Sequence, residues 1–169
     1  DLEKTKWFQQ TYLRAQANSV IAQQLRQIET IDLTDAALEQ ICGLMKERAT
    51  FAQDILTEGA YLFGRVNAFD AETIRKKWKP ETAAYIQEWK NIVGSITEFS
   101  AQEIEVSFKT FLAEKQLGIG AVLLPYRLVL TGVGAGPGMF EISEFLGKEE
   151  VLARIDLGLA AVEKILHEA

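Results

Sequence analysis

Apolar residues recur every three to four positions along almost the whole chain, whereas strand-like alternation over several residues is hard to find. This spacing places apolar side chains on one face of a helix. The stripes predict helices that begin near residues 2, 18, 35, 51, 71, 81, 101 and 151, the last of them long and amphipathic. The sequence therefore predicts an all-α fold built from many helices.

Polar residues ahead of these stripes predict where the helices start. Ser100 followed by Glu103 has the spacing of a capping box, in which each side chain bonds the backbone amide of the other residue. Further N-caps are expected at Asn18, at Thr34 or Asp35, and at Asp70. Pro80 should stop one helix and sit in the first turn of the next, and Gly118 should end the helix that follows Ser100.

The weakest periodicity lies in residues 61–69, which contain Gly64 and Asn67. A junction there divides the chain into two helical subdomains, residues 1–66 and residues 67–169. The sequence has no internal repeat and no low-complexity tract that would favour a different organisation.

The composition is that of an ordinary globular protein, with 48% hydrophobic and 25% charged residues among 169. No apolar stretch approaches the roughly 20 residues that span a bilayer. The first residues have the mixed charge of a helix rather than the pattern of a signal peptide, and the lone Cys42 allows no internal disulfide. These features predict a cytoplasmic protein that does not enter the membrane.

The net charge of −6 argues against binding nucleic acid by general attraction, so an RNA partner would require a local basic patch. One candidate is the run Arg-Lys-Lys-Trp-Lys at residues 75–79. The alternative interpretation of this run is a solvated helix end whose Trp78 packs inward.

The most unusual segment is the glycine-rich stretch at residues 132–138, in which uncovered backbone would allow close approach of a ligand or a helix. Its glycines do not fit the dinucleotide-binding pattern, because the sixth position is Pro137 or Met139 in the two possible registers. Gly147 and Lys148 are followed by Glu149, which breaks the P-loop pattern. A nucleotide pocket is therefore not expected.

Side chains suited to catalysis or metal binding are scarce. His167 is the only histidine and belongs to the solvated end of the last helix, which excludes histidine-based triads and multi-histidine metal sites. Cys42 stands among apolar residues and suits a buried core position. The many carboxylates are explained by exposed acidic helix faces, so neither a catalytic residue nor a metal ligand is predicted.

Several blocks of sequence are distinctive, and in chain order they are DLEKTKWFQQTYL at residues 1–13, LMKER with Phe51 at 44–51, PYRLVLTG at 125–132, GPGMFEI at 136–142, and LGKE with Arg154 and Ile155 at 146–155. Together they resemble the C-terminal, anticodon-binding part of bacterial glutamyl-tRNA synthetases. The resemblance spans essentially the whole chain in order, and the blocks from residue 125 onward are specific.

This resemblance implies a helical anticodon-binding module of a class I ligase that joins glutamate to its tRNA with ATP and magnesium. The two catalytic signatures of that class, resembling His-Ile-Gly-His and Lys-Met-Ser-Lys, do not occur in the sequence. We therefore expect a fragment that requires no cofactor, binds neither ATP nor glutamate and does not aminoacylate. Its expected partner is glutamate-specific tRNA, and it is expected to be a monomer.

By the same resemblance, the anticodon-binding residues are Arg127, Gly136, Pro137, Met139 and Phe140. A guanidinium can donate two parallel hydrogen bonds to a base edge, and Pro, Met and Phe offer apolar surface to unstacked bases. Relatives often carry a hydroxyl at position 136, so a contact from Gly136 must come from the backbone. The alternative for Arg127 is a structural role at a helix end.

Arg48 matches an arginine with which the family senses the first anticodon base, although the match is approximate. An ion pair on a helix face is the alternative for this side chain.

Two other classes of function compete with tRNA recognition. The first is a helical protein-interaction module that does not bind RNA, with the glycine-rich segment as a tight connection between helices. The net acidity favours this alternative, whereas the ordered blocks of resemblance favour tRNA. The second, a stand-alone small-molecule enzyme, is disfavoured by the scarcity of catalytic side chains.

Overall fold

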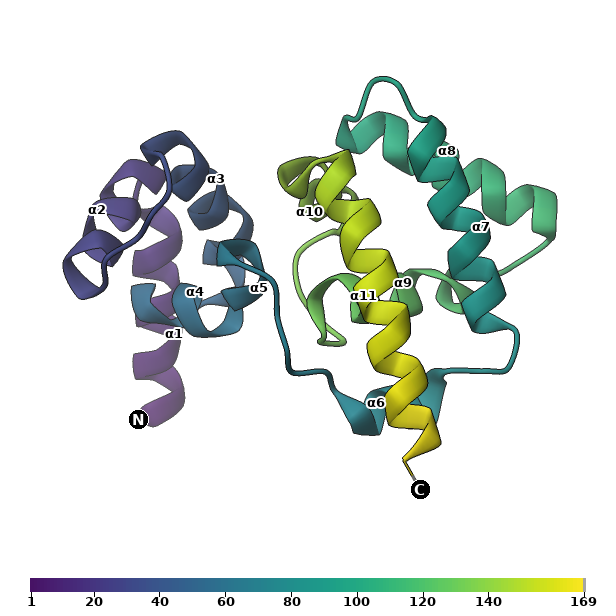
Figure 1. The fold of residues 1–169 in the computed structure, drawn as a ribbon. Helices are drawn as coiled ribbons and strands as arrows, with labels where there is room; N and C mark the ends of the chain where they lie inside the picture. The colour runs from purple at the N-terminus through teal and green to yellow at the C-terminus, as the bar shows by residue number, and fades with distance from the viewer. Residues whose placement is uncertain (169) are drawn as a thin grey trace. The chain divides into compact units, whose positions relative to one another are not determined.

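The computed structural model describes residues 1–168, which contain helices and turns but no strand (Figure 1). The predicted all-α fold is thus confirmed. Contacts between Cα atoms separate two compact units, one comprising Asp1–Gly64 and the other beginning at Arg65. This boundary lies inside the stretch 61–69, two residues before the division predicted from the sequence. The functional roles assigned to the subdomains 1–66 and 67–169 stay predictions.

The first unit is a cluster of short helices around an aliphatic core. Its elements are α1 (Leu2–Ala15), α2 (Asn18–Ile28), α3 (Asp35–Met45), the 3₁₀ turn η1 (Lys46–Arg48), α4 (Ala52–Glu58) and α5 (Ala60–Phe63). α2 packs against α3 and α4, and Ile21, Leu25 and Leu38 are completely buried. Cys42 is buried with them, and burial raises the pKa of its thiol to about 11. The predicted core role of Cys42 is confirmed.

The second unit packs its helices around Trp89. Its elements are α6 (Ala71–Lys77), α7 (Thr82–Ser95), α8 (Ala101–Lys115), the 3₁₀ turn η2 (Ile119–Ala121), α9 (Leu123–Thr131), α10 (Met139–Leu146) and α11 (Lys148–His167). The Trp89 ring meets Phe108 edge-on at 4.9 Å and Tyr126 at 5.8 Å, the geometry that aromatic quadrupoles favour. The long helix α11 contacts α6, α7, α9 and α10 (Figure 1).

Three of the predicted N-caps form. The side chains of Thr34, Asp70 and Ser100 accept backbone hydrogen bonds at 3.1, 3.0 and 3.2 Å. The reciprocal half of the capping box, from the Glu103 side chain, does not form. The amide of Ala101, the first residue of α8, donates to Glu144 of α10 at 2.6 Å, so a neighbouring helix satisfies this donor.

Three boundary predictions were wrong. Asn18 is the first helical residue of α2 and caps nothing, because the N-cap position is Ala17. α8 ends before Gly118, since Gln116 adopts the left-handed conformation with φ 56° and the amide of Leu117 bonds the carbonyl of Leu112 at 2.9 Å, as in a Schellman motif. Pro80 precedes the first turn of α7, which begins at Thr82 after the N-cap Glu81.

The helices α9 and α10 have no counterpart among the helices predicted from periodicity. They contain nine and eight residues, too few for the apolar period to repeat clearly. Gly132 follows α9, and Gly138 and Gly147 bound α10.

Helices α9 and α11 approach each other closely at Gly158. A Cβ atom added to Gly158 would lie 2.6 Å from the Cα of Val129 in α9. Because the contact is with backbone, no side-chain rotation could relieve it. Only glycine allows the two helices to pack at this distance.

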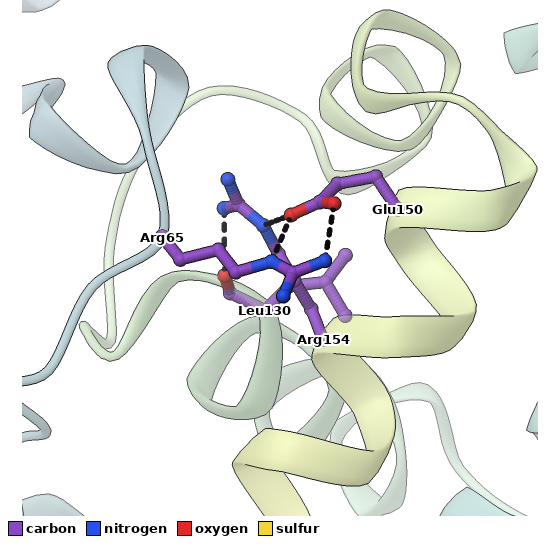
Figure 2. A network of polar contacts seen from close by, with 4 residues as sticks. All are labelled: Arg65, Leu130, Glu150 and Arg154. Carbon is purple, nitrogen blue, oxygen red and sulfur yellow. Dashed lines mark hydrogen bonds and ion pairs between the residues drawn. The ribbon is translucent and has the colours of Figure 1, made fainter.

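Near this contact, a buried arginine joins the two helices (Figure 2). Arg154 of α11 is only 5% exposed, and its Nη1 donates to the carbonyl of Leu130 in α9 at 3.2 Å. Its Nε donates to Glu150 at 2.8 Å. Arg65 donates to both oxygens of the same carboxylate, each at 2.9 Å. Because these guanidinium groups stabilise the anion, with Arg65 contributing most, the pKa of Glu150 falls from 4.5 to about 2.

We predict that Gly158→Ala destabilises the protein by about 1–3 kcal/mol, because the added methyl group meets the backbone of α9. The matched control is Gly94→Ala in α7, where the added Cβ has no neighbour within 4 Å. That change should stabilise the protein by about 0.4–1 kcal/mol. Urea unfolding followed by circular dichroism measures both. Equal stabilities for the two variants would show that α9 and α11 do not require glycine at their contact.

We also predict that Glu150→Gln lowers the free energy of unfolding by about 1–3 kcal/mol at neutral pH, since buried Arg154 loses its counter-charge and faces Arg65. The carboxylate has a folded-state pKa of about 2, below its usual 4.5. Its stabilisation is therefore complete above about pH 5 and is lost as the pH falls toward 2. The difference in the free energy of unfolding between wild type and Glu150→Gln should therefore become smaller as the pH is lowered from about 5 toward 2.

The control for this prediction is Glu149→Gln, which removes an exposed carboxylate from the same first turn of α11. It should change stability by no more than about 0.5 kcal/mol. If Glu150→Gln lowers the free energy of unfolding by the same amount at every pH, the charge of the carboxylate is not the cause of the loss.

Candidate functional site

The glycine-rich loop, residues 132–138, connects α9 to α10 and is fixed at its first residue. Gly132 has φ 79°, in the left-handed region, and a Cβ there would collide with the carbonyl oxygen of Ala68. The Gly132 carbonyl accepts a hydrogen bond from the Asp70 amide at 2.8 Å. Glycine is therefore required at the point where the loop meets the start of α6.

Thr131, the last residue of α9, shapes the first turn of the loop. Its buried hydroxyl lies 2.8 Å from the carbonyl of Arg127 and accepts from the amide of Val133 at 3.2 Å. A helix carbonyl and a loop amide are thus joined through one side chain, which limits how the backbone leaves α9.

Arg127 fixes the far end of the loop. Its Nη1 donates to the carbonyl of Pro137 at 2.8 Å, across the width of the loop. The side chain is half-buried and comes from the middle of α9 rather than from a helix end. A structural contact of Arg127, the alternative predicted from the sequence, is therefore present, although in a different place. Its contact with an anticodon base stays a prediction.

The predicted anticodon residues differ in how far solvent reaches them. Pro137 and Met139 are buried, with Met139 2% exposed at the start of α10. Gly136 and Phe140 are half-buried, and the Phe140 ring lies 5.5 Å from that of Phe108. The structure thus presents Gly136 and Phe140 at the surface, with Pro137 and Met139 beneath them.

Sequence reasoning did not single out the most exposed part of the loop, which is Val133, Gly134 and Ala135. Gly134 and Ala135 have little or no side chain, so their backbone is accessible, whereas Val133 presents an apolar side chain that is 40% exposed. The four glycines in seven positions were the only signal for them, and that signal does not separate exposed positions from buried ones.

Arg48 belongs to the first unit, whereas the loop belongs to the second. It is exposed in the turn η1. Among residues 1–168 it makes no ion pair, so the alternative of a helix-face ion pair was wrong. Its neighbour Glu47 lies 3.7 Å from Arg14 instead. The role of Arg48 in sensing the first anticodon base stays a prediction.

The basic run at residues 75–79 occupies the last turn of α6 and the residues just after it. Its four cationic side chains are exposed, and Trp78 is half-buried. The Trp78 ring lines a groove of about 780 Å³ with Pro80, Leu159 and Val162. The solvated helix end of the alternative is thus present and leaves the cations accessible, although Trp78 is half-buried along the groove rather than packed into the core.

The described part of the chain offers no cluster of three or more His, Cys, Asp and Glu side chains that could hold a metal ion. His167 is exposed in the last turn of α11, 3.8 Å from Glu163, as predicted. No helix within residues 1–168 is both long enough and apolar enough to cross a membrane.

The sequence matches known proteins along most of its length. Residues 12–159 match the family described as "Anticodon binding domain". The chain is 34% identical to a glutamate–tRNA ligase of Pelodictyon phaeoclathratiforme, covering 100% of this chain and 36% of that protein. For the glutamate–tRNA ligase of Christiangramia forsetii, the identity is 33%, over 92% of this chain and 31% of the relative.

Solved structures show the same similarity. A crystal structure of a glutamate tRNA ligase from Elizabethkingia meningosepticum in complex with its amino acid superposes with a TM-score of 0.85 and 36% identity. The match covers 95% of this chain and 32% of that chain. The chain therefore spans about a third of the length of the relatives it matches. Since the family match extends over most of the sequence, this chain belongs to the anticodon-binding domain family.

Proposed function

We propose that this chain binds the anticodon of glutamate tRNA as part of a glutamate–tRNA ligase, with ATP- and magnesium-dependent aminoacylation carried out by the rest of that protein. The observation that carries the proposal is the loop at residues 132–138, which is exposed at residues 133–135 and is held at one end by Gly132 and at the other by the bond from Arg127 to Pro137. The named relatives support the choice of amino acid.

The loop has the chemistry that unstacked bases require. Gly134 and Ala135 carry little or no side chain, so a base can come close to backbone donors and acceptors, and Val133 adds exposed apolar surface. The half-exposed Phe140 ring offers a face for stacking beside them. Pro137 and Met139 act from below by holding this surface in place, and Gly136 contributes backbone contacts.

Arg127 contributes in two ways in this proposal. Its bond to Pro137 keeps the loop in the conformation that accepts a base, and its guanidinium recognises a base edge. Fixing the loop in advance lowers the entropy cost of binding single-stranded RNA, which otherwise opposes recognition. Arg48 of the first unit senses the first anticodon base. The protein acts as a monomer in the cytoplasm.

We predict that Arg127→Ala, installed in the full-length ligase, costs on the order of 1–3 kcal/mol in discrimination for the correct anticodon, because one specific base contact is lost. Aminoacylation of tRNAs with a mismatched anticodon should change little. Aminoacylation of tRNAs that differ only in the anticodon measures this difference. Gly134→Ala serves as a second probe, since its added Cβ meets Thr73 only at 3.6 Å and should leave the fold intact.

The control for these variants is Arg14→Ala, which removes a positive charge from α1 in the first unit. It should affect all anticodons equally. Equal losses across anticodons for Arg127→Ala and Gly134→Ala, with unchanged melting temperatures, would contradict base recognition by the loop. If neither variant changes aminoacylation of any of the tRNAs, the result would favour the alternative that the chain is a protein-interaction module.

We further predict that the isolated chain does not catalyse glutamate-dependent exchange between ATP and pyrophosphate. The reason is chemical, since neither catalytic signature of class I synthetases occurs in its sequence. The full-length ligase, assayed in parallel, provides the positive control. Exchange above background by the purified chain would contradict the assignment of catalysis to the rest of the ligase.

A further inference from the structure

The basic edge, defined as Lys77 and Lys79 with the neighbouring Arg75 and Lys76, concentrates positive charge in an otherwise acidic chain. Four of the 18 lysines and arginines fall within five consecutive positions, whereas the net charge of the chain is −6. All four side chains are exposed. None of them forms an ion pair or a side-chain hydrogen bond with the described residues, so their charge is not neutralised by protein.

Stabilisation of helix α6 explains the presence of only some of these four cations. Arg75, Lys76 and Lys77 lie in the last turn of α6, where cations favour the negative end of the helix dipole. However, α6 has only seven residues, and three of them are consecutive cations in its last turn. Lys79 lies beyond the helix, where the dipole does not explain it.

Lys77 and Lys79 form one wall of a cleft of about 280 Å³, with Tyr85 from α7 beside them. Gly120 and Leu124, the latter at the start of α9, also line this cleft. Glu81 is the one carboxylate that lines this cleft, and it pairs with neither lysine. Two cations, a phenol and accessible glycine backbone suit a phosphodiester group.

The cleft adjoins the glycine-rich loop. A Cβ added to Gly134 would lie 3.6 Å from Thr73 of α6 and 3.8 Å from Leu124 of α9. Leu124 is also part of the cleft wall. The exposed part of the loop and the cleft therefore share the Leu124 side chain, so the two surfaces adjoin at this residue.

We propose that the basic edge binds the phosphate backbone of the RNA strand that flanks the bases held by the loop. This site deepens the proposed tRNA-binding function and rests on it for the identity of the RNA. Its contacts are to phosphate, so they contribute affinity and strand orientation without selecting bases.

The test compares binding of the chain to two RNA hairpins with the same stem, one carrying the glutamate anticodon and the other a scrambled loop. Fluorescence anisotropy over a range of potassium chloride concentrations gives affinity and salt dependence. For the double variant Lys77→Gln, Lys79→Gln, affinity for both hairpins should fall about tenfold at moderate salt, and the log–log salt slope should decrease by about 1.4. Glu81→Gln should bind both hairpins more tightly, because it removes the carboxylate from the cleft.

The matched control is the double variant Lys4→Gln, Lys6→Gln, which makes the same charge change at exposed positions of α1. It should leave affinity within about twofold and the slope nearly unchanged. Losses of the same size in both double variants would overturn the proposal, as would wild-type protein that binds neither hairpin. Circular dichroism of both variants checks that each remains folded.

The same data separate this proposal from the proposed function. If wild type binds both hairpins equally and the Lys77 and Lys79 variant still weakens both, the basic edge binds phosphate but the loop does not read the anticodon. If wild type prefers the glutamate anticodon and the variant behaves like the Lys4 and Lys6 control, the loop reads bases and the basic edge is not a phosphate site.

Discussion

The second unit depends on the contact between α9 and α11. Gly158 lets the two backbones approach within a distance that any side chain would prevent, and Arg154 bonds the Leu130 carbonyl beside it. Together these contacts fix the C-terminal half of α9. Thr131 and Gly132, which direct the loop, follow Leu130 immediately, so the conformation of the candidate site is determined by helix packing beneath it rather than by the loop residues alone.

The buried arginine makes this arrangement specific as well as stable. A guanidinium removed from water is costly unless its charge and donors are satisfied. Glu150 supplies the charge from one turn earlier in α11, and Arg65, the first residue of the unit, holds the carboxylate in place (Figure 2). The entry of the chain into the unit, the start of α11 and the end of α9 thus share one network. An alternative packing of α11 would keep the Glu150–Arg154 pair, which lies within the helix, but would break the bonds to Leu130 and Arg65.

Much of the fold could be predicted because most helices are long enough for their apolar period to repeat, and because Asp70 and Ser100 mark their starts. The prediction weakened where tertiary contacts decide the outcome. Gln116 takes a left-handed conformation that composition would assign to Gly118, since the final hydrogen bonds of α8 close before that glycine. The short helices α9 and α10 depend on their packing with α11 and α8 more than on their own pattern.

The candidate site shows a related limit. Sequence identifies Met139 as an apolar side chain suited to contact a base, but the same property equally suits a core, and the structure buries it. Exposure of Val133 and Ala135 has no sequence signal beyond the surrounding glycines. The sequence thus pointed to the segment, and its role in binding stays a prediction, while the division between exposed and buried residues depends on tertiary packing.

The acidity of the chain and its proposed RNA partner are compatible if attraction is confined to one edge. A uniformly basic surface would hold a strand in many positions, because phosphate contacts carry no sequence information. Here the basic edge adjoins the loop, whereas the chain as a whole carries a net charge of −6 that repels phosphate elsewhere. Such an arrangement binds RNA in general more weakly than a uniformly basic surface would. It favours the one position of the strand in which bases meet the rigid loop. In the proposed function, discrimination depends on the loop that Arg127 and Gly132 hold in place, and the charge orients the strand.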